Sequence, residues 1–158
     1  MYRYLTQGQA DQLLEALRGH PLEAIITLAL VTGLRRDELL SLKWQEIDLE
    51  RCEVRVRHPK TKSRDRIIHF HQEVSEVLKQ HRLRQMETRL EVGTARPDLD
   101  LVFPDGAGGF LRPVQLVKGF YDILEQAKLP RMRFHDLRVA WWRAFFARLR
   151  TGKDGDSR

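Results

Sequence analysis

Four side chains at separate points of this 158-residue sequence are of the types that phosphoryl-transfer chemistry needs. They are two arginines, Arg35 and Arg138, one histidine, His135, and a lysine of the turn 58–65, which is Lys60 or Lys62. Two guanidinium groups can clamp the non-bridging oxygens of a phosphodiester bidentately and stabilise the extra charge of its transition state. A lysine can protonate the departing sugar oxygen, and a histidine can donate to the phosphate or move a proton. This set predicts phosphodiester transesterification that requires neither a metal ion nor a cofactor.

The first arginine lies in the segment 32–39, where Gly33 is expected to end one helix and Arg35 to start the next. A guanidinium at a helix N-terminus adds its donors to those of the backbone, and both favour an anionic oxygen. Glu38, one helical turn later, can orient an arginine or a neighbouring strand by hydrogen bonding. The same spacing also fits a solvated Arg/Glu pair on a helix surface.

A basic turn at residues 58–65 follows, with Asp65 and Glu53 as its only nearby acids. A hairpin tip of this charge can lie along a phosphate backbone. It can equally be a solvated sheet edge whose cations discourage aggregation of strands. Lys60 and Lys62 compete for the role of general acid, since a one-step change of register would bring either ammonium group to the phosphate.

The third feature is the pair His135 and Arg138, which share one face if the segment is helical. Leu137 would then point into the core. Taken alone, these residues also fit an ordinary helix start with Asp136 near its N-terminus.

Hydrophobic periodicity predicts the elements that must position these side chains. Helical spacing is expected from Thr6 to Gly19, over 22–32, after Arg35, over 72–92, from Pro113 and from His135 to about Arg150. Alternation with period two predicts three short antiparallel strands within 47–49, 52–57 and 66–70. In 72–92 the apolar residues predict a long amphipathic helix; they are Val74, Val77, Leu78, Leu83, Met86 and Leu90. The fold class is therefore α+β and mainly α, with a small three-stranded antiparallel sheet.

Composition limits the possible partners. With 28 Lys+Arg against 22 Asp+Glu, the net charge of +6 favours a polyanion such as nucleic acid, although many basic proteins bind none. The single cysteine, Cys52, excludes an internal disulfide and is expected to be a small buried residue on a strand. The sequence contains neither a run of about 18 apolar residues nor the apolar core of a signal peptide. We therefore expect a soluble, cytoplasmic protein without a membrane partner.

Five motifs in order resemble those of tyrosine site-specific recombinases and phage integrases. They are Thr32-Gly-Leu-Arg35-Arg-Asp-Glu38-Leu-Leu, Leu42-Lys-Trp44, Ile47-Asp-Leu49, Lys60-Thr and His135-Asp-Leu-Arg138. The resemblance covers residues 5–138 and implies the helical catalytic domain of DNA breaking-rejoining enzymes. It implies that Arg35, Lys60, His135 and Arg138 are catalytic, that Glu38 supports the site, and that Lys62, Arg64 and Arg66 contact DNA. The implied partners are double-stranded DNA and, for a full-length enzyme, other recombinase protomers in a synaptic complex.

The sequence departs from this family after Arg138, where residues 139–150 lack the later family motifs and the nucleophilic tyrosine. The three tyrosines, Tyr2, Tyr4 and Tyr121, all precede His135 and fit packing roles. We therefore expect no nucleophile here, a catalytic domain over 1–150 that is incomplete at its C-terminus, a disordered tail at 151–158 and no N-terminal core-binding domain.

Two other functions remain open at this point. One is a non-catalytic DNA-binding module or prophage remnant that uses the same basic face. The other is a metal-dependent nuclease using His58, His69 and His71, although no paired carboxylates at metal-ligand spacing accompany these histidines.

Overall fold

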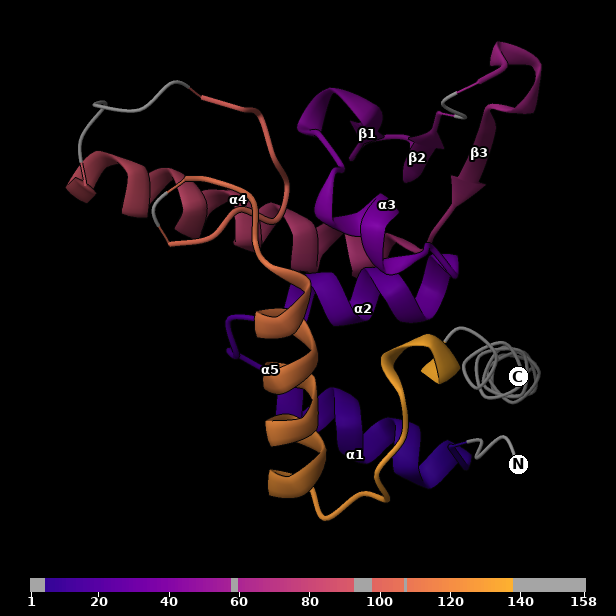
Figure 1. The fold of residues 1–158 in the computed structure, drawn as a ribbon, viewed down its shortest axis with the longest axis vertical. Helices are drawn as coiled ribbons and strands as arrows, with labels where there is room; N and C mark the ends of the chain where they lie inside the picture. The colour runs from indigo at the N-terminus through magenta and orange to yellow at the C-terminus, as the bar shows by residue number, and fades with distance from the viewer. Residues whose placement is uncertain (1–4, 58–59, 93–97, 107, 138–158) are drawn as a thin grey trace, which may run out of the picture. The chain divides into compact units, whose positions relative to one another are not determined.

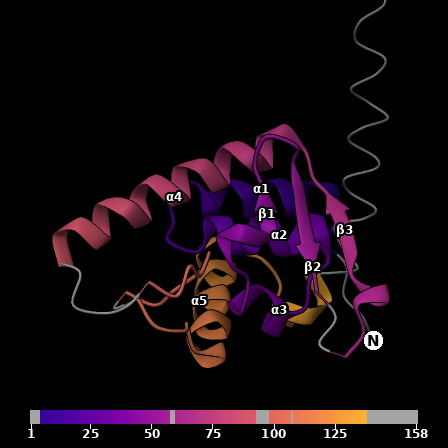
Figure 2. The ribbon, with the colours of Figure 1, turned by 90° about the horizontal axis from the view of Figure 1, so that it is seen from above.

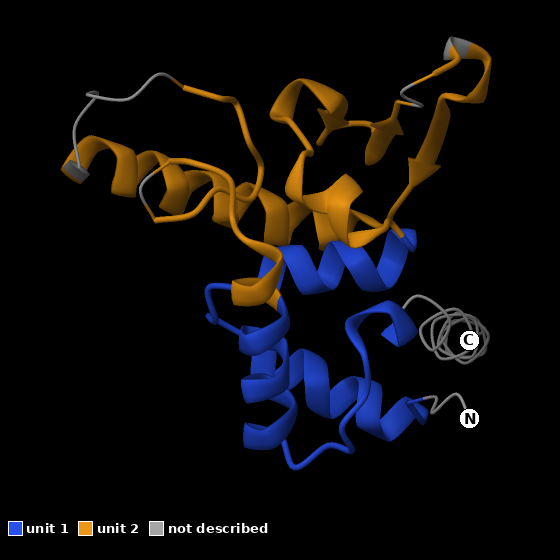
Figure 3. Ribbon diagram, in the orientation of Figure 1, with its two compact units in different colours: residues 1–33, 117–158 blue, residues 34–116 orange. Residues whose placement is uncertain are grey.

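The computed structural model describes residues 5–57, 60–92, 98–106 and 108–137. The chain divides into two compact units (Figure 3): unit 1 comprises residues 1–33 and 117–158, and unit 2 comprises residues 34–116. Each unit is described by itself below. Among the described residues, no helix is both long enough and apolar enough to cross a membrane.

Unit 1 is helical. It contains α1 (Gln7–Leu17), α2 (Glu23–Thr32), α5 (Pro113–Gln126) from residue 117 onward, and the short 3₁₀ helix η3 (Phe134–Asp136). The predicted capping box starts α1, because the Gln9 N–H donates to the Thr6 hydroxyl oxygen (3.2 Å) and the Thr6 N–H donates to Gln9 Oε1 (2.9 Å). Helix α2 ends where Gly33 adopts the left-handed conformation at φ 67°, as predicted.

The core of unit 1 forms where these helices bury their apolar faces. Helix α2 is buried nearly all round, as its continuous apolar run predicts. The remaining core side chains come from α1, α5 and η3, and include Leu13, Leu17, Phe120, Ile123, Leu124, Phe134 and Leu137. The Phe134 ring packs edge-on against Phe120, with the ring centroids 5.5 Å apart, so η3 is fixed to α5.

Unit 2 contains the predicted sheet. It comprises α3 (Arg36–Leu40), the 3₁₀ helix η1 (Trp44–Glu46), β1 (Ile47–Asp48), β2 (Glu53–Val56), the 3₁₀ helix η2 (Lys62–Arg64), β3 (Arg66–His69) and α4 (Gln72–Val92) (Figure 1). The strands are antiparallel in the order β1-β2-β3. This arrangement confirms the expected α+β class with its three short strands.

The register of the sheet separates its two faces. Val54 pairs with Ile68 and Val56 with Arg66, and both valines are buried on the inner face. Arg55 pairs with Ile67, and both side chains are exposed on the outer face. The alternation of side chains along the strands therefore places Arg55 and Arg66 on opposite faces of the sheet.

Helix α4 has the predicted bounds, but its predicted amphipathic burial is only half right. Val74 and Leu78 in the first half are buried, whereas Leu83, Met86 and Leu90 in the second half are exposed. The 21 residues of α4 span about 31 Å, far more than strands of four residues can cover. The helix consequently extends past the sheet (Figure 2).

Cys52 corrects a smaller expectation. It lies in the turn before β2 rather than on the strand, is only half-buried, and has a left-handed φ of 55°. Its Sγ lies 3.4 Å from Gln72 Oε1. The predicted strand starts one residue too early because a tight hairpin needs one residue with positive φ.

Candidate active site

Arg35 occupies the position just before α3, with an extended backbone and an exposed side chain. Its N–H donates to Glu38 Oε1 at 2.9 Å, which closes the first turn of the helix. Because α3 has only five residues, few peptide dipoles align in it, so the positive charge at this point comes mainly from side chains. The arginine is thus held by its backbone while its side chain is presented to solvent.

Glu38 joins this helix to the sheet. The Nη2 atom of Arg66 on β3 donates to Glu38 Oε1 at 3.3 Å and Oε2 at 3.4 Å. The Glu38 carboxylate therefore contacts both the backbone of Arg35 and the side chain of Arg66. This geometry suits a group that orients an arginine and a neighbouring strand together.

The turn between β2 and β3 carries the candidate lysines. Lys60 and Arg64 are exposed, and the Arg64 N–H donates to the Thr61 carbonyl oxygen at 3.2 Å in η2. Residues 58–59 and the side chain of Lys62 lie outside the described part of the structure. The choice between Lys60 and Lys62 as general acid stays a prediction.

His135 is exposed on η3, and the next residue explains how its turn is held. The buried Asp136 carboxylate accepts hydrogen bonds from the Arg133 N–H (3.3 Å), Nε (3.2 Å) and Nη2 (3.2 Å). The Arg133 side-chain hydrogen bonds are the main cause that lowers the pKa of Asp136, so the carboxylate stays ionised. Leu137 is buried as expected.

Arg133 is a residue that the sequence analysis missed. Its signal was available in principle, because an acid three residues after an arginine can pair with it across one turn. The candidate Arg138 and almost all of the predicted last helix lie outside the described residues. Arg35 and His135 belong to different units, and their convergence on one phosphate stays a prediction.

The described residues also bear on the metal-dependent alternative. Among them, no three His, Cys, Asp or Glu side chains gather as the ligands of a metal ion would. His69 instead lies 3.7 Å from Glu53 across two neighbouring strands. His69 is the last residue of β3 and His71 follows the strand, and both side chains are exposed.

Comparison with known sequences decides the family. The sequence model of the phage integrase family matches residues 3–147. The chain belongs to the phage integrase family. Its relatives include a XerC-like tyrosine recombinase of Caldanaerobacter subterraneus, 33% identical over 165 aligned positions that cover 89% of this chain and 42% of the relative. The integrase of Salmonella phage P22 is 28% identical over 149 positions, covering 88% of this chain and 35% of that protein.

Solved structures of this family share the fold. The XerA recombinase superposes with a TM-score of 0.75 at 25% identity, covering 89% of this chain and 49% of that one. The catalytic core of lambda integrase superposes with a TM-score of 0.64 at 19% identity, covering 92% of this chain and 88% of that one. The chain therefore has the fold of a recombinase catalytic core, and it spans less than half the length of the two relatives matched by sequence.

Proposed function

We propose that this chain provides the catalytic domain of a tyrosine recombinase that performs DNA integration or site-specific recombination. The family match over residues 3–147 carries this proposal. The link from the Arg35 backbone through Glu38 to Arg66 supports it, because it holds the start of α3 beside a basic strand. The solved relatives include XerH bound to its difH substrate and the Tn1549 transposon integrase in complex with circular intermediate DNA.

The proposed reaction is a transesterification. A tyrosine hydroxyl attacks the phosphorus, a phosphotyrosyl ester forms, and the bond to the departing sugar oxygen breaks. Arg35 and Arg138 stabilise the charge on the non-bridging oxygens, Lys60 protonates the departing oxygen, and His135 donates to the phosphate or moves a proton. Glu38 holds Arg35 in place.

DNA contacts and the nucleophile complete the proposal. Lys62, Arg64 and Arg66 would position the DNA backbone. The ion pair with Glu38 orients the Arg66 side chain. Tyr2, Tyr4 and Tyr121 all precede His135, and we propose that none of them is the nucleophile. Double-stranded DNA and further recombinase protomers are the proposed partners, and the cytoplasm is the proposed location.

A chimera tests the assignment of Arg35. This chain replaces the aligned region of the XerC-like relative, and covalent protein–DNA adducts are trapped on a suicide substrate carrying the relative's recombination site. Changing Arg35→Ala should lower the rate of adduct formation by about 100-fold or more, because it removes a preorganised donor to the transition state. The matched control is Arg36→Ala, since Arg36 is an exposed neighbour whose Nε lies 3.5 Å from Asp37.

The controls decide between catalysis and binding. A folded chimera that binds the DNA but forms no adduct would favour the non-catalytic DNA-binding alternative. Equal adduct formation by the Arg35→Ala and Arg36→Ala chimeras would show that Arg35 is not catalytic.

A further inference from the structure

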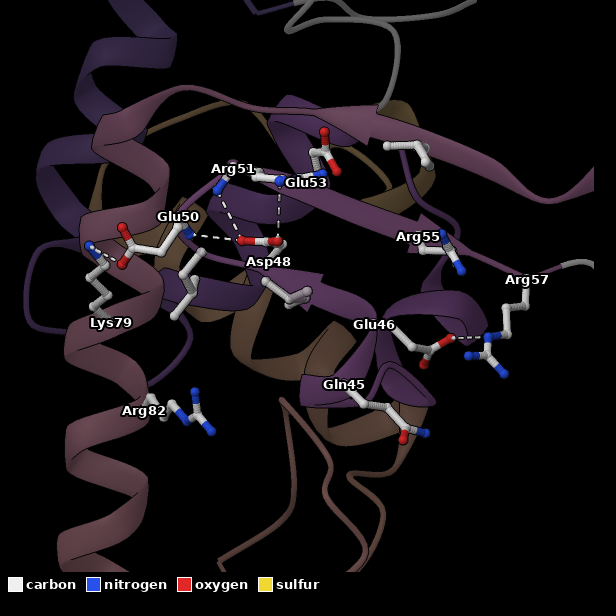
Figure 4. Close-up of a pocket in the computed structure, with 13 residues that line it drawn as sticks. Gln45, Glu46, Asp48, Glu50, Arg51, Glu53, Arg55, Arg57, Lys79 and Arg82 are labelled. Atoms are coloured by element: carbon white, nitrogen blue, oxygen red, sulfur yellow. Dashed lines mark hydrogen bonds and ion pairs between the residues drawn. The ribbon is translucent and has the colours of Figure 1, made fainter.

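A hollow of about 590 Å³ lies on the outer face of the sheet, and all its walls belong to unit 2. The walls come from η1, the β1–β2 hairpin, β3 and α4 (Figure 4). None of the residues proposed for catalysis lines it. Its role is therefore open.

Strand alternation separates this hollow from the Glu38–Arg66 pair. Arg66 is in register with Val56 and contacts Glu38, whereas Arg55 is in register with Ile67 and lines the hollow. Adjacent side chains on a strand point to opposite faces of the sheet. Arg66 and Arg55 therefore lie on opposite faces of the sheet, and the outer face can bind something other than the phosphate proposed for Arg66.

The charges that line the hollow do not cancel. Three of its four carboxylates pair with a cation that also lines it: Glu46 with Arg57 (3.9 Å), Asp48 with Arg51 (4.0 Å) and Glu50 with Lys79 (3.9 Å). The fourth, Glu53, lies 3.7 Å from His69 on β3. Within the described part of the chain, Arg55 and Arg82 have no carboxylate partner. Figure 4 shows these two guanidinium groups on opposite sides of the hollow.

The position of Arg82 is set by an aromatic ring. Its Cζ lies 5.0 Å from the centroid of the Trp44 ring, and the Trp44 Nε1–H donates to Gln85 Oε1 at 3.0 Å. This cation–π contact holds the guanidinium beside the ring and leaves N–H groups that can donate to a ligand. Ile67, 49% exposed, adds an apolar surface to the same hollow.

We propose that this hollow binds an acidic segment of a partner protein. One carboxylate of the segment pairs with Arg55, a second pairs with Arg82, and an aliphatic side chain packs on Ile67. A DNA duplex does not suit this surface. It carries about one negative charge per 1.7 Å of helix axis, so its phosphates would be repelled by the four carboxylates that line the hollow. A peptide carries separate carboxylates that can avoid them.

Selection from a random-sequence peptide library displayed on phage, with the whole chain as bait, tests the proposal. The enriched sequences should carry paired acidic residues beside an aliphatic one. Fluorescein-labelled copies of these peptides are then titrated by anisotropy against the wild-type chain and its Arg55→Gln and Arg82→Gln variants. Each variant should bind about tenfold more weakly, because it loses one charged hydrogen-bonding partner.

Two controls make the result specific. Arg84→Gln changes an exposed arginine of α4 outside the hollow and should leave peptide binding unchanged. Duplex DNA titrated in the same buffer should lose affinity with Arg64→Gln but not with Arg55→Gln. Circular dichroism verifies that each variant is folded.

Three outcomes would overturn the proposal. They are enrichment of no peptides or of peptides without acids, equal binding when glutamine replaces the glutamates of the peptide, and loss of DNA affinity in Arg55→Gln as large as in Arg64→Gln. The last outcome would assign the outer face to DNA instead.

Discussion

At the scale of single residues, one carboxylate links a helix start to a strand. Glu38 accepts the Arg35 N–H at 2.9 Å and pairs with Arg66 at 3.3 Å, while its own side chain is 26% exposed. The first contact is half of a capping box, and the second is a partly solvated ion pair. The placement of Arg35 therefore depends on a residue that need not touch the substrate.

We predict that Glu38→Ala lowers the free energy of unfolding by about 1–2 kcal/mol, the sum of a lost cap and a weak surface ion pair. Glu38→Gln should cost less, because an amide oxygen still accepts the Arg35 N–H. Urea denaturation measures both. Asp37→Ala, at the exposed neighbouring position, is the control, and a loss as large as that of Glu38→Ala would contradict the linking role.

A second residue, His81, is expected to make the stability of unit 2 depend on pH. Its ring lies 5.4 Å from that of Phe103, and its Nε2 lies 2.6 Å from the Val102 carbonyl oxygen. Because a carbonyl only accepts, Nε2 carries the proton of the neutral ring. Burial is the main cause that lowers the pKa of His81 below 6.5, and the hydrogen bond to Val102 opposes it.

A histidine with a lowered pKa in the folded state stabilises the protein above its unfolded pKa, and this contribution is lost as pH falls through the folded value. The urea midpoint of the wild-type chain should therefore fall as pH drops below 6.5. His81→Gln should be less stable at neutral pH by about 1–3 kcal/mol and should lose this part of the pH dependence. The exposed His69→Gln should keep it, and identical pH profiles for the two variants would exclude His81 as the cause.

At the scale of elements, the turn that carries His135 is held by the residues on either side of it. Asp136 is buried and binds Arg133 through three hydrogen bonds, and Phe134 packs on Phe120. The histidine therefore stands on a turn fixed from both sides. The position of His135 on this turn is therefore set by contacts within unit 1.

We predict that Asp136→Asn lowers the free energy of unfolding by about 1 kcal/mol at neutral pH, because the partner Arg133 is largely exposed and solvent screens the pair. The folded pKa of Asp136 is lowered, so its contribution is complete above the unfolded value near 3.8 and is lost as pH falls below it. Urea midpoints across this acidic range should fall more steeply in the wild-type chain than in the variant. The exposed Asp122→Asn should behave like the wild-type chain, and a shared profile of Asp136→Asn and wild type would reject the assignment.

The elements show how far sequence alone reaches. The start of α3 directly after Arg35 was predictable to within one residue, because Gly33 and the apolar spacing act over a few residues. The exposure of Leu83 was not predictable from the sequence. Periodicity indicates which side chains share a helix face, but not how much of that face is covered by other elements.

The candidate sites show the same limit. Glu38 was expected to orient a strand, but which arginine it meets depends on the register of β3. The hollow could not be predicted from the sequence, because Arg55 and Arg82 line the same hollow only when α4 lies beside the sheet. Local patterns thus predict single residues of a site better than they predict its partners.

At the scale of the whole molecule, the proposed catalytic residues are divided between the two units. Arg35 and Lys60 belong to unit 2, and His135 belongs to unit 1. Their convergence on one phosphate is a prediction that DNA binding by the whole chain can test. DNA binding is therefore the measurement that involves the molecule as a whole.

Binding of duplex DNA should weaken steeply as salt rises, because the net charge of +6 implies release of condensed counterions. Each lost phosphate contact reduces the slope of log affinity against log salt by about 0.9. We predict a reduction of about this size for Arg64→Ala and for Lys60→Ala, whose exposed side chains lie on the turn between β2 and β3. Anisotropy titrations over a series of salt concentrations measure the slopes.

Arg84→Ala removes the same charge from a different surface and should leave the slope unchanged, which separates a local contact from a general effect of net charge. Equal slopes for all three variants would show that the turn does not follow the phosphate backbone. Its cations would then act as a solvated edge that protects the sheet from other strands. A reduced slope for the turn variants alone would place the DNA along β2 and β3, on the side from which Lys60 has to reach the departing oxygen.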